Sequence, residues 1–507
     1  MDLVSNLALG FQTILEPANL LVCVAGVTLG MLVGVLPGIG AMAAISMLLP
    51  LTWHLEPATA LILLAGIFYG GQYGGSTASI LLNLPGTAAN AVTCLDGYPM
   101  ARQGRAGVAL VITTLSSFVG ASVAIVLMMT LAPVLARAAL GFGPSEYFAV
   151  MTFALVVTST MSGAALKGFA MVALGALLGM IGVDIGTGQY RFTFGSIELA
   201  GGLNLVAVAM GLLGVAEILS RLSGEDSVAP VERHRVSVRS LLPTRRDIRD
   251  SALPTLRGTV IGTLSGILPG TGATLASFLS YAVEKRVAAD PSRFGRGAIE
   301  GVAAPEAANN AAVQAAFIPT LTLGIPGDAV MAILLGAMLT HGVTPGPMIL
   351  ENDPALFWGL VASFWLGNLV LLVLNIPLIG LWVRLLSVPY RMLFPVILCL
   401  IGIGVYSINY STFDILVVVL FGILGYGMKR LDYPAAPLLF GFILGPMVED
   451  HLRRALLVGH GDPAVLVASP VSAGFLVASV LLAVLSSGVA GRVIRGTVGR
   501  NARSDKT

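Results

Sequence analysis

The chain has 507 residues, of which 56% are hydrophobic and 11% are charged, with a formal net charge of +2 and a mean hydropathy of +0.90. A soluble domain carries about 25% charged residues, so this composition excludes an ordinary soluble protein and predicts an integral membrane protein. The basic residues fall in short loops and not on one continuous face, which excludes an extended nucleic-acid-binding surface.

Apolar runs recur along nearly the whole chain, for example VALVITTLSSFVGASVAIVLMMTLAPVL and FLVASVLLAVLSSGVAG. A membrane-spanning helix needs roughly 17 to 25 such residues. The runs are continuous and do not alternate with polar residues, as the strands of a membrane barrel would. The sequence therefore predicts an all-α polytopic membrane protein.

The first apolar run is interrupted by GVLPGIGA, residues 34–41, which places Pro37, Gly38 and Gly40 where a membrane helix should continue. A break of this kind frees backbone N–H and C=O groups. In hydrocarbon each unsatisfied group costs several kcal/mol, so such breaks are tolerated only against protein or a water-filled cavity. The half-helix that starts after the break would present free N–H groups and a positive dipole end, which attract carboxylates.

A further stretch in the first half is unusually polar for a membrane segment. YGGQYGGSTASILLNLPGTAAN, residues 69–90, places Gly, Ser, Thr, Gln and Asn in an expected membrane segment. Polar groups at such depth usually face a bundle interior or an aqueous path. This stretch also contains the motif LNLPGTA.

The second half repeats these features. GILPGTGA, residues 266–273, lies 232 residues after GVLPGIGA, and Glu449 and Arg453 lie 232 residues after Glu217 and Arg221. LGIPGDA, residues 323–329, lies 241 residues after LNLPGTA, and the polar PEAANNAAVQ precedes it. We predict a first transmembrane repeat over 1–222, a hydrophilic cytoplasmic linker over 223–253, a second repeat over 254–460, an extra C-terminal span over 461–490 and a basic cytoplasmic tail over 491–507.

The distribution of Lys and Arg predicts the orientation, because cytoplasmic loops carry the excess of positive charge. With the linker and the tail in the cytoplasm, only Arg137, Arg191, Arg453 and Arg454 lie outside. The segment around LPGTG then enters and returns, which predicts a re-entrant helical hairpin. Each half makes about five crossings, so the second half is inverted relative to the first, with a periplasmic N-terminus and a cytoplasmic C-terminus.

Paired breaks in an inverted repeat indicate the central site of a transporter. The candidate substrate-binding residues lie at the two PGxG breaks and in the polar stretches and Pro-Gly motifs near them: Pro37, Gly38, Gly40, Ser76, Thr77, Asn83, Gly86, Thr87, Pro269, Gly270, Thr271, Gly272, Asn309, Asn310 and Gly327. The alternatives are helix packing for the glycines, favoured for Gly26 and Gly30, and structural hydrogen bonds between helices for the polar side chains.

Asp328, after the break in LGIPGDA, and Glu306, before the two asparagines, are candidates for binding a coupling Na⁺ or proton. The alternative for a carboxylate beside a helix start is that it only caps the helix. The sequence indicates no catalytic residues, no metal site and no cofactor beyond the coupling ion. It also has no phosphate-binding loop of the Walker type, so we do not expect ATP hydrolysis.

These motifs resemble TctA, the large membrane subunit of the tripartite tricarboxylate transporters of bacteria. The matching stretches are GMLVGVLPGIGAMAAISMLLPLT, FYGGQYGGSTASILLNLPGTAANAVTCLDGYPMARQGRAGVAL, GTLSGILPGTGATLASFLSYAVEKR and PEAANNAAVQAAFIPTLTLGIPGDAVMAILLGAMLTHGVTPGP. The resemblance implies a secondary carrier of the inner membrane that imports citrate-like di- or tricarboxylates with Na⁺ or H⁺. It further implies a periplasmic solute-binding protein, TctC, and a small membrane subunit, TctB, as partners. Asp328 departs from the small hydroxyl residue expected there.

A gated anion channel, in which the same breaks form a filter, is the alternative function. An intramembrane enzyme is disfavoured, because the chain contains no HExxH motif and its serines have no candidate base nearby in sequence.

Overall fold

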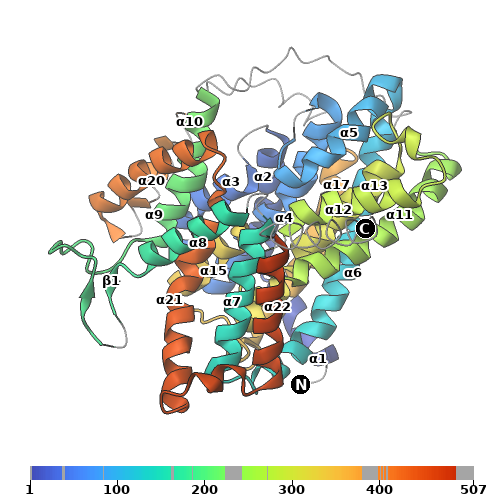
Figure 1. Ribbon diagram of the computed structural model, residues 1–507. Coiled ribbons are helices and arrows are strands. Elements are labelled where there is room, and N and C mark those ends of the chain that lie inside the picture. The colour runs from blue at the N-terminus through green and yellow to red at the C-terminus, as the bar shows by residue number, and fades with distance from the viewer. Residues whose placement is uncertain are drawn as a thin grey trace, which may run out of the picture. The chain divides into compact units, whose positions relative to one another are not determined.

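The computed structural model is almost entirely helical in the residues that it describes (Figure 1). These residues are 3–36, 40–83, 85–161, 165–184, 187–222, 242–270, 272–378, 395, 398–399, 401–403, 405–406 and 409–486. The strands among them are β1 (Gly182–Val183) and β2 (Tyr190–Arg191), which pair antiparallel. The predicted all-α class is confirmed.

The chain folds into two compact units, and each unit takes residues from both halves of the sequence. Unit 1 comprises Met1–Leu140 and Asn204–Gly427, and unit 2 comprises Gly141–Leu203 and Met428–Thr507. The elements of unit 1 are α1 (Leu3–Ile14), α2 (Pro17–Val35), α3 (Gly40–Leu48), η1 (Leu49–His54), α4 (Pro57–Leu82), η2 (Ala88–Asn90), α5 (Ala91–Met100), η3 (Ala101–Arg105), α6 (Ala106–Ala139), α9 (Leu205–Ala209), η4 (Met210–Val215), α10 (Ala216–Leu222), α11 (Arg245–Ile267), α12 (Gly272–Val287), η6 (Pro291–Arg293), α13 (Glu300–Ala315), α14 (Phe317–Leu323), α15 (Ala329–Thr340), α16 (Ile349–Asn352), α17 (Pro354–Asn375) and most of α20 (Thr412–Arg430). The remaining elements, α7 (Pro144–Met161), α8 (Ala165–Gly179), α21 (Ala435–Val458), η7 (Pro463–Val467) and α22 (Pro470–Ser486), belong with β1 and β2 to unit 2.

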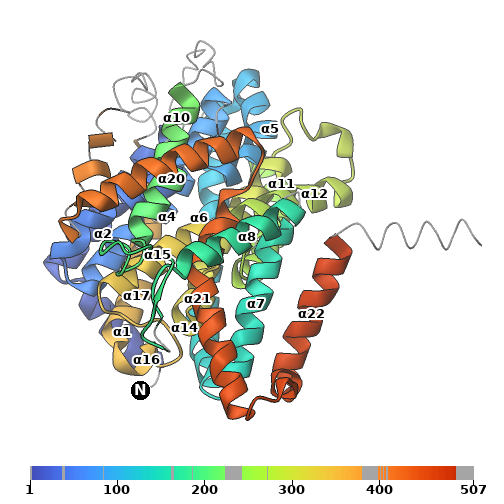
Figure 2. The same ribbon diagram turned by 60° about the vertical axis from the view of Figure 1, so that its left-hand side comes forward.

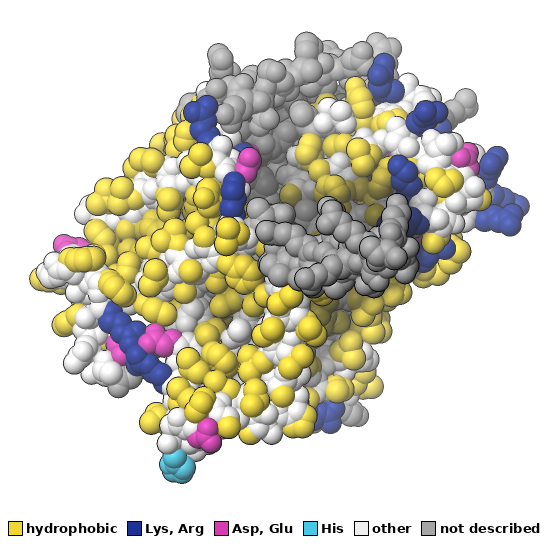
Figure 3. All heavy atoms as spheres, viewed as in Figure 1, with side chains coloured by type: hydrophobic (Ala, Val, Ile, Leu, Met, Phe, Trp, Pro, Cys, Tyr) yellow, Lys and Arg dark blue, Asp and Glu magenta, His cyan; other side chains and the backbone are white. Residues whose placement is uncertain are grey.

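Several helices are suited to a membrane. Four helical segments within the described residues are long and apolar enough to cross one: Pro17–Val35, Ala88–Ala139, Pro354–Asn375 and Thr412–Arg430. Apolar side chains cover much of the face shown in Figure 3. On α11, for example, Leu256, Val260 and Leu264 recur at helical spacing and are exposed, whereas an exposed helix face in water would be polar. These features are those of a multi-pass membrane protein.

Glycine stripes bring α2 onto α4 and α11 onto α13. On α2, a Cβ at Gly26 would lie 2.6 Å from the carbonyl oxygen of Leu63, and a Cβ at Gly30 would overlap that of Ile67. On α11, Gly258 and Gly262 face the carbonyl oxygens of Ala304 and Ala308 in the same way. Small residues at such spacing let two helix backbones approach closely. The packing interpretation of Gly26 and Gly30 is therefore confirmed, and it extends to their repeats.

The predicted hairpin around LPGTG consists of α11 and α12. Arg257 on α11 donates from Nε to Oε1 of Glu284 on α12 at 2.5 Å, which ties the two arms together. The backbone turns through Gly270 and Gly272, whose φ values of +81° and +63° favour glycine. The number of membrane crossings and the re-entrant depth of this hairpin stay predictions.

The first arm is longer than the sequence predicted, because α11 has 23 residues and begins at Arg245, inside the predicted 223–253 linker. The helix start is a capping box: the Thr244 side chain accepts from the backbone N–H of Asp247, and Asp247 accepts from the N–H of Thr244. Arg105, from the turn before α6, also pairs with Asp247. These contacts satisfy the first N–H groups of the helix, so it extends into the polar segment.

We predict that the ionised carboxyl group of Asp247 makes the folding stability of the protein sensitive to acid. Burial opposes ionisation, but the hydrogen bonds from Thr244 and the charge of Arg105 outweigh it, so the pKa of Asp247 lies below its ordinary value of 3.8. A lowered pKa contributes stability above the unfolded-state pKa, and this contribution is lost as the pH falls through the folded-state pKa. We expect Asp247→Asn to lower the melting temperature in detergent by up to about 2 °C at pH 7. The difference from wild type should begin to shrink as the pH falls to about 4, near the unfolded-state pKa, and should vanish only below the lowered folded-state pKa; a difference independent of pH would contradict this assignment.

Unit 2 is held together by close helix packing and by ion pairs between side chains. α7 packs against both α21 and α22 (Figure 2). A Cβ at Gly175 on α8 would overlap the carbonyl oxygen of Leu438 on α21, so these two helices also touch along their backbones.

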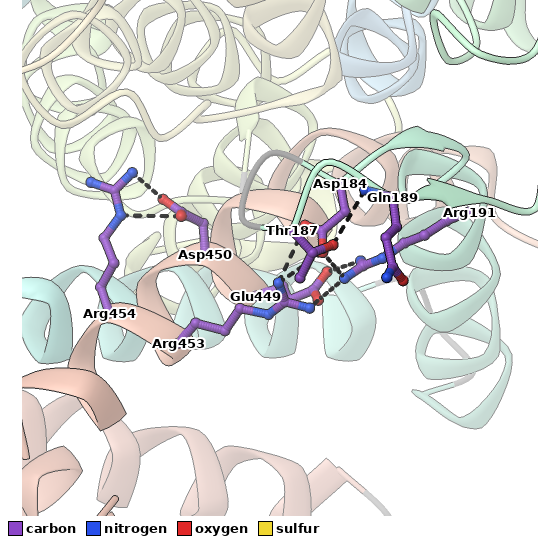
Figure 4. Close-up of polar contacts among 8 residues, drawn as sticks. All are labelled: Asp184, Thr187, Gln189, Arg191, Glu449, Asp450, Arg453 and Arg454. Atoms are coloured by element: carbon purple, nitrogen blue, oxygen red, sulfur yellow. Dashed lines mark hydrogen bonds and ion pairs between the residues drawn. The ribbon is translucent and has the colours of Figure 1, made fainter. Parts of the chain in front are cut away.

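A cluster of four charges fixes the β1–β2 hairpin to α21 (Figure 4). Arg191 binds Asp184 at 2.8 Å and Glu449 at 2.9 Å, and Arg453 binds Asp184 at 3.0 Å. Two cations thus meet two carboxylates, and the charges balance within the cluster. These contacts give the four residues a structural role within unit 2.

Candidate functional site

The structure contains four helix breaks in unit 1, two in each half: the two predicted PGxG tips and the breaks at LNLPGTA and LGIPGDA. Pro37 and Gly38 at the first tip and Thr271 at the second lie outside the described residues. The residues next to them are described: Gly40 begins α3, Pro269 is buried, Gly270 is half-buried, and Gly272 begins α12. Each tip therefore separates a helix that ends from one that starts.

Each half contains a second break, after α4 in the first half and after α14 in the second, and the two breaks are built in the same way. α4 ends at Asn83 and α14 ends at Gly324, with left-handed φ values of +56° and +69°. The next helices start after the N-cap residues Thr87 and Asp328. Asn83 and Thr87 lie 241 residues before Gly324 and Asp328. The motifs LNLPGTA and LGIPGDA, which recur at an offset of 241 and not 232, thus contain equivalent left-handed turns.

The last helical turn before each tip lies against the second break of the same half through glycines. A Cβ at Gly86 would overlap the carbonyl oxygen of Gly34, and a Cβ at Gly327 would lie 3.3 Å from that of Gly266. The N–H of Gly270 donates to the carbonyl oxygen of Gly327 at 2.8 Å. Side chains larger than hydrogen would separate the two breaks, which explains why glycine stands on both sides.

The breaks of the two halves also approach each other. α12 follows the second tip and packs against η2 and α5 of the first half, while α3 follows the first tip and packs against α15 of the second half. Within the second half, a Cβ on Gly272 would lie 3.1 Å from Cβ of Asp328, which brings the start of α12 to the N-cap of α15. Helix starts from all four breaks are therefore gathered in one region of unit 1.

Asp328 caps α15. Its Oδ1 accepts from the backbone N–H of Met331 at 2.8 Å, which is the ordinary N-cap contact. This observation gives the carboxylate a structural partner and matches the capping alternative. A role in binding a coupling ion stays a prediction.

A variant pair separates these two roles. Threonine is also a good N-cap and is the residue at the equivalent first-half position, so we expect Asp328→Thr to retain folding and gradient-driven uptake. Asp328→Ala should cost about 1 kcal/mol of stability through loss of the cap. Thermal unfolding in detergent and uptake into proteoliposomes measure both. Loss of gradient dependence in a stable Asp328→Thr variant would instead assign the coupling ion to this carboxylate.

The polar residues of α4 and α13 meet around the side chain of Glu306, which is 1% exposed. Ser76 Oγ donates to its Oε2 at 2.5 Å, and Asn90 Nδ2 donates to its Oε1 at 3.2 Å. Thr93 Oγ1 donates to Oε1, and Ser117 Oγ lies 3.5 Å from Oε2. The carboxyl group of α13 is thus surrounded by neutral donors from α4, η2, α5 and α6.

The other predicted polar residues have different surroundings. Thr77 donates to Asn375 Oδ1 at 3.2 Å, a contact between helices, whereas Asn83 is exposed at the end of α4. Asn310 donates from Nδ2 to Ser117 Oγ at 2.8 Å. Among the residues that the structure describes, Asn310 Oδ1 and both side-chain polar atoms of Asn309 are buried without a hydrogen-bond partner. Such groups carry a desolvation cost that a ligand could offset.

Sequence reasoning missed Asn90, Thr93 and Ser117 as partners of Glu306. Asn90 and Thr93 stand three residues apart in AANAVT, a spacing that puts them on one helix face. Ser117 lies in an otherwise apolar run and carried no such signal. None of the hydrogen bonds to Glu306 comes from Lys or Arg.

Comparisons with known proteins identify the family of the chain. The tripartite tricarboxylate transporter TctA family matches residues 20–440. The chain is 52% identical over 492 residues to the Agrobacterium vitis "uncharacterized 52.8 kDa protein in TAR-I ttuC' 3'region", covering 96% of this chain and 97% of the relative. It is 55% identical over 229 residues to the "uncharacterized protein in TAR-II ttuC' 3'region" of the same organism, covering 45% and 95%. No solved structure matches. The chain belongs to the tripartite tricarboxylate transporter TctA family.

Proposed function

We propose that this chain is the large transmembrane permease subunit of a binding-protein-dependent secondary transporter. It imports di- or tricarboxylates of the citrate type, coupled to Na⁺ or H⁺, across the bacterial inner membrane. Its partners are a small membrane subunit like TctB and a periplasmic solute-binding protein like TctC. Membership in the TctA family supports these assignments.

The observation that carries the proposal is the gathering of helix starts from four breaks in one region. Helix N-termini bind anions through free N–H groups and through the helix dipole. The backbone contact between Gly270 and Gly327 holds two of the breaks together. A carboxylate bound there would be held by N–H groups, hydroxyls and amides rather than by a cationic side chain. Moderate affinity follows, with capture at low concentration left to the binding protein.

The proposed topology is an inverted repeat of about five crossings per half. Two exchanged contacts support it: α4 of the first half packs on α17 of the second, and α13 of the second packs on α6 of the first. Such reciprocal contacts are expected when two related halves surround one site. Cysteines placed in the loops around Arg102 and His341 would test the orientation. The first should react only after permeabilisation of the inner membrane and the second without it.

Uptake into proteoliposomes tests the function. The purified chain, its small membrane subunit and the binding protein are reconstituted and supplied with labelled citrate, succinate or malate. Accumulation should require an imposed Na⁺ or proton gradient and should exceed the equilibrium level. Uptake that never passes the substrate's own electrochemical equilibrium would indicate the gated channel instead. A thermal-shift screen of the binding protein against small organic acids identifies which substrate to use.

A further inference from the structure

Within the part of unit 1 that the structure describes, no cationic side chain pairs with the carboxyl group of Glu306. Two neutral side chains donate to each of its oxygens, and no described ion pair includes it. An ionised carboxylate without a counter-ion is expensive to bury, and a buried carboxyl group commonly takes a proton instead. The role of this group in the molecule is therefore not that of an ordinary structural ion pair such as Arg257–Glu284.

We propose that Glu306 takes up and releases the proton that is co-transported with the carboxylate. This inference rests on the proposed function and makes the coupling ion a proton. Uptake forms an O–H bond on Oε2 with a proton from the aqueous side, and release returns that proton to water on the other side. No other bond forms or breaks.

The hydrogen bonds around Glu306 accommodate both protonation states. In the ionised state Ser76 donates from Oγ to Oε2. In the protonated state Oε2 donates to Ser76 Oγ, and the Ser76 proton turns to the carbonyl oxygen of Gln72, 3.1 Å away. Asn90 Nδ2 donates to Ser76 Oγ at 2.9 Å in either state. Rotation of one hydroxyl is thus sufficient, and no side chain has to repack.

A proton fits these surroundings better than Na⁺. Na⁺ requires several oxygen atoms that present lone pairs. In the described residues, each group that contacts the carboxyl oxygens of Glu306 does so as a donor. The unpartnered amide oxygens of Asn309 and Asn310 on the same helix do not belong to this set of contacts. The lone pairs of the carboxyl oxygens are already directed at donors.

A short chain of hydrogen bonds connects Glu306 to a helix break. Asn90 donates to Glu306 and accepts on Oδ1 from Thr87 Oγ1 at 2.5 Å. Thr87 is the N-cap of η2 and follows Gly86, which contacts the first tip. Protonation removes the charge from the acceptor of Asn90 and weakens that bond, since hydrogen bonds to ionised groups are about twice as strong as neutral ones. The state of Glu306 is thereby transmitted to the proposed substrate site.

Few other titratable groups face Glu306. Among the described residues, Tyr73 from α4 and Cys94 from α5 interact with it. On α11 and α12, Arg257 is paired with Glu284 and Tyr281 donates to Asp96 at 2.9 Å. The side chains of α6 that reach Glu306 are hydroxyls and do not titrate in the relevant range. Within the described cluster of Glu306 and its four hydrogen-bond donors, Glu306 is therefore the residue that carries a carboxyl group.

The test compares wild type with Glu306→Gln, which has the same shape and mimics the protonated state. In proteoliposomes with acid outside, wild type should accumulate labelled citrate in proportion to the pH gradient. Glu306→Gln should lose all stimulation by the gradient but still exchange labelled for unlabelled citrate at equal pH, because exchange needs no proton release. A control with both Arg257→Gln and Glu284→Gln removes another buried carboxylate together with its counter-ion and should keep the gradient dependence. Full gradient stimulation in Glu306→Gln, or wild-type uptake driven by Na⁺ alone, overturns the proposal.

Infrared difference spectroscopy gives a readout that does not depend on transport. Spectra of wild type at acid minus alkaline pH should contain the carbonyl band of a protonated carboxylic acid, and Glu306→Gln should lack one such band. Identical spectra overturn the assignment of Glu306. Should no carboxylate be transported by wild type, the proposed function fails while the spectra still decide the protonation of Glu306.

Discussion

The Gly262→Leu variant is expected to lose most of its folded protein from the membrane. Gly262 lies where α11 crosses α13, and a Cβ there would overlap the carbonyl oxygen of Ala308. Because the obstacle is backbone and not a flexible side chain, the helices must separate to admit leucine. Overpacking typically costs about 1–3 kcal/mol and occasionally more, and a clash with backbone belongs at the upper end of that range, a large part of the total stability of a typical domain.

Size-exclusion chromatography of a fluorescent fusion in detergent measures this loss. Gly30→Leu should behave alike, since Gly30 faces Ile67 in the first half in the same way. Gly474→Leu on α22 is the matched control, because a Cβ there meets nothing within 4 Å. A monodisperse Gly262→Leu protein at the wild-type level would show that the glycine stripe is not required for packing.

The Gly270→Leu variant is expected to insert and fold but to lose carboxylate uptake to background. Gly270 is half-buried at the second tip, and its N–H binds the carbonyl oxygen of Gly327. Its φ of +81° costs a leucine about 1–2 kcal/mol, which a folded membrane protein tolerates. The larger effect is steric, because the side chain would occupy the space between the breaks where we propose the substrate binds.

Uptake must be corrected for the amount of monodisperse protein. Asparagine adopts left-handed φ more readily than leucine, so Gly270→Asn keeps the backbone and adds a smaller polar group. We expect it to retain partial uptake. Equal uptake by Gly270→Leu and wild type would refute the placement of the site. The sequence predicts the same result for Gly38→Leu, a position outside the described residues.

The predictable part of the fold was the part encoded by local chemistry. Apolar runs fix the membrane class, and Pro with Gly fixes the breaks. Glycines at four-residue spacing fix the face on which α2 and α11 pack. Each of these signals lies within a few residues of its consequence, so no knowledge of distant neighbours was needed.

The remaining features depend on contacts between distant segments. Glu306 was recognisable as a buried acidic residue, but its partner Ser117 lies 189 residues away in a run that reads as ordinary lipid-facing helix. The start of α11 was missed because Asp247 gains a partner in Arg105, which is 142 residues away. The division into two units was also unpredictable, since the boundaries at Leu140 and Gly427 coincide with no change in composition.

The interleaved units constrain how the protein is made. α7 and α8 leave the ribosome early, yet their neighbours α21 and α22 belong to the last part of the chain. While the intervening segments are synthesised, the surface of α8 that receives α21 must be covered by lipid or by the insertion machinery. Domains generally fold as units during synthesis, so unit 2 can close only when translation is nearly complete. A ribosome that stops after Gly427 would release a chain with two orphaned helices, a ready substrate for membrane proteases.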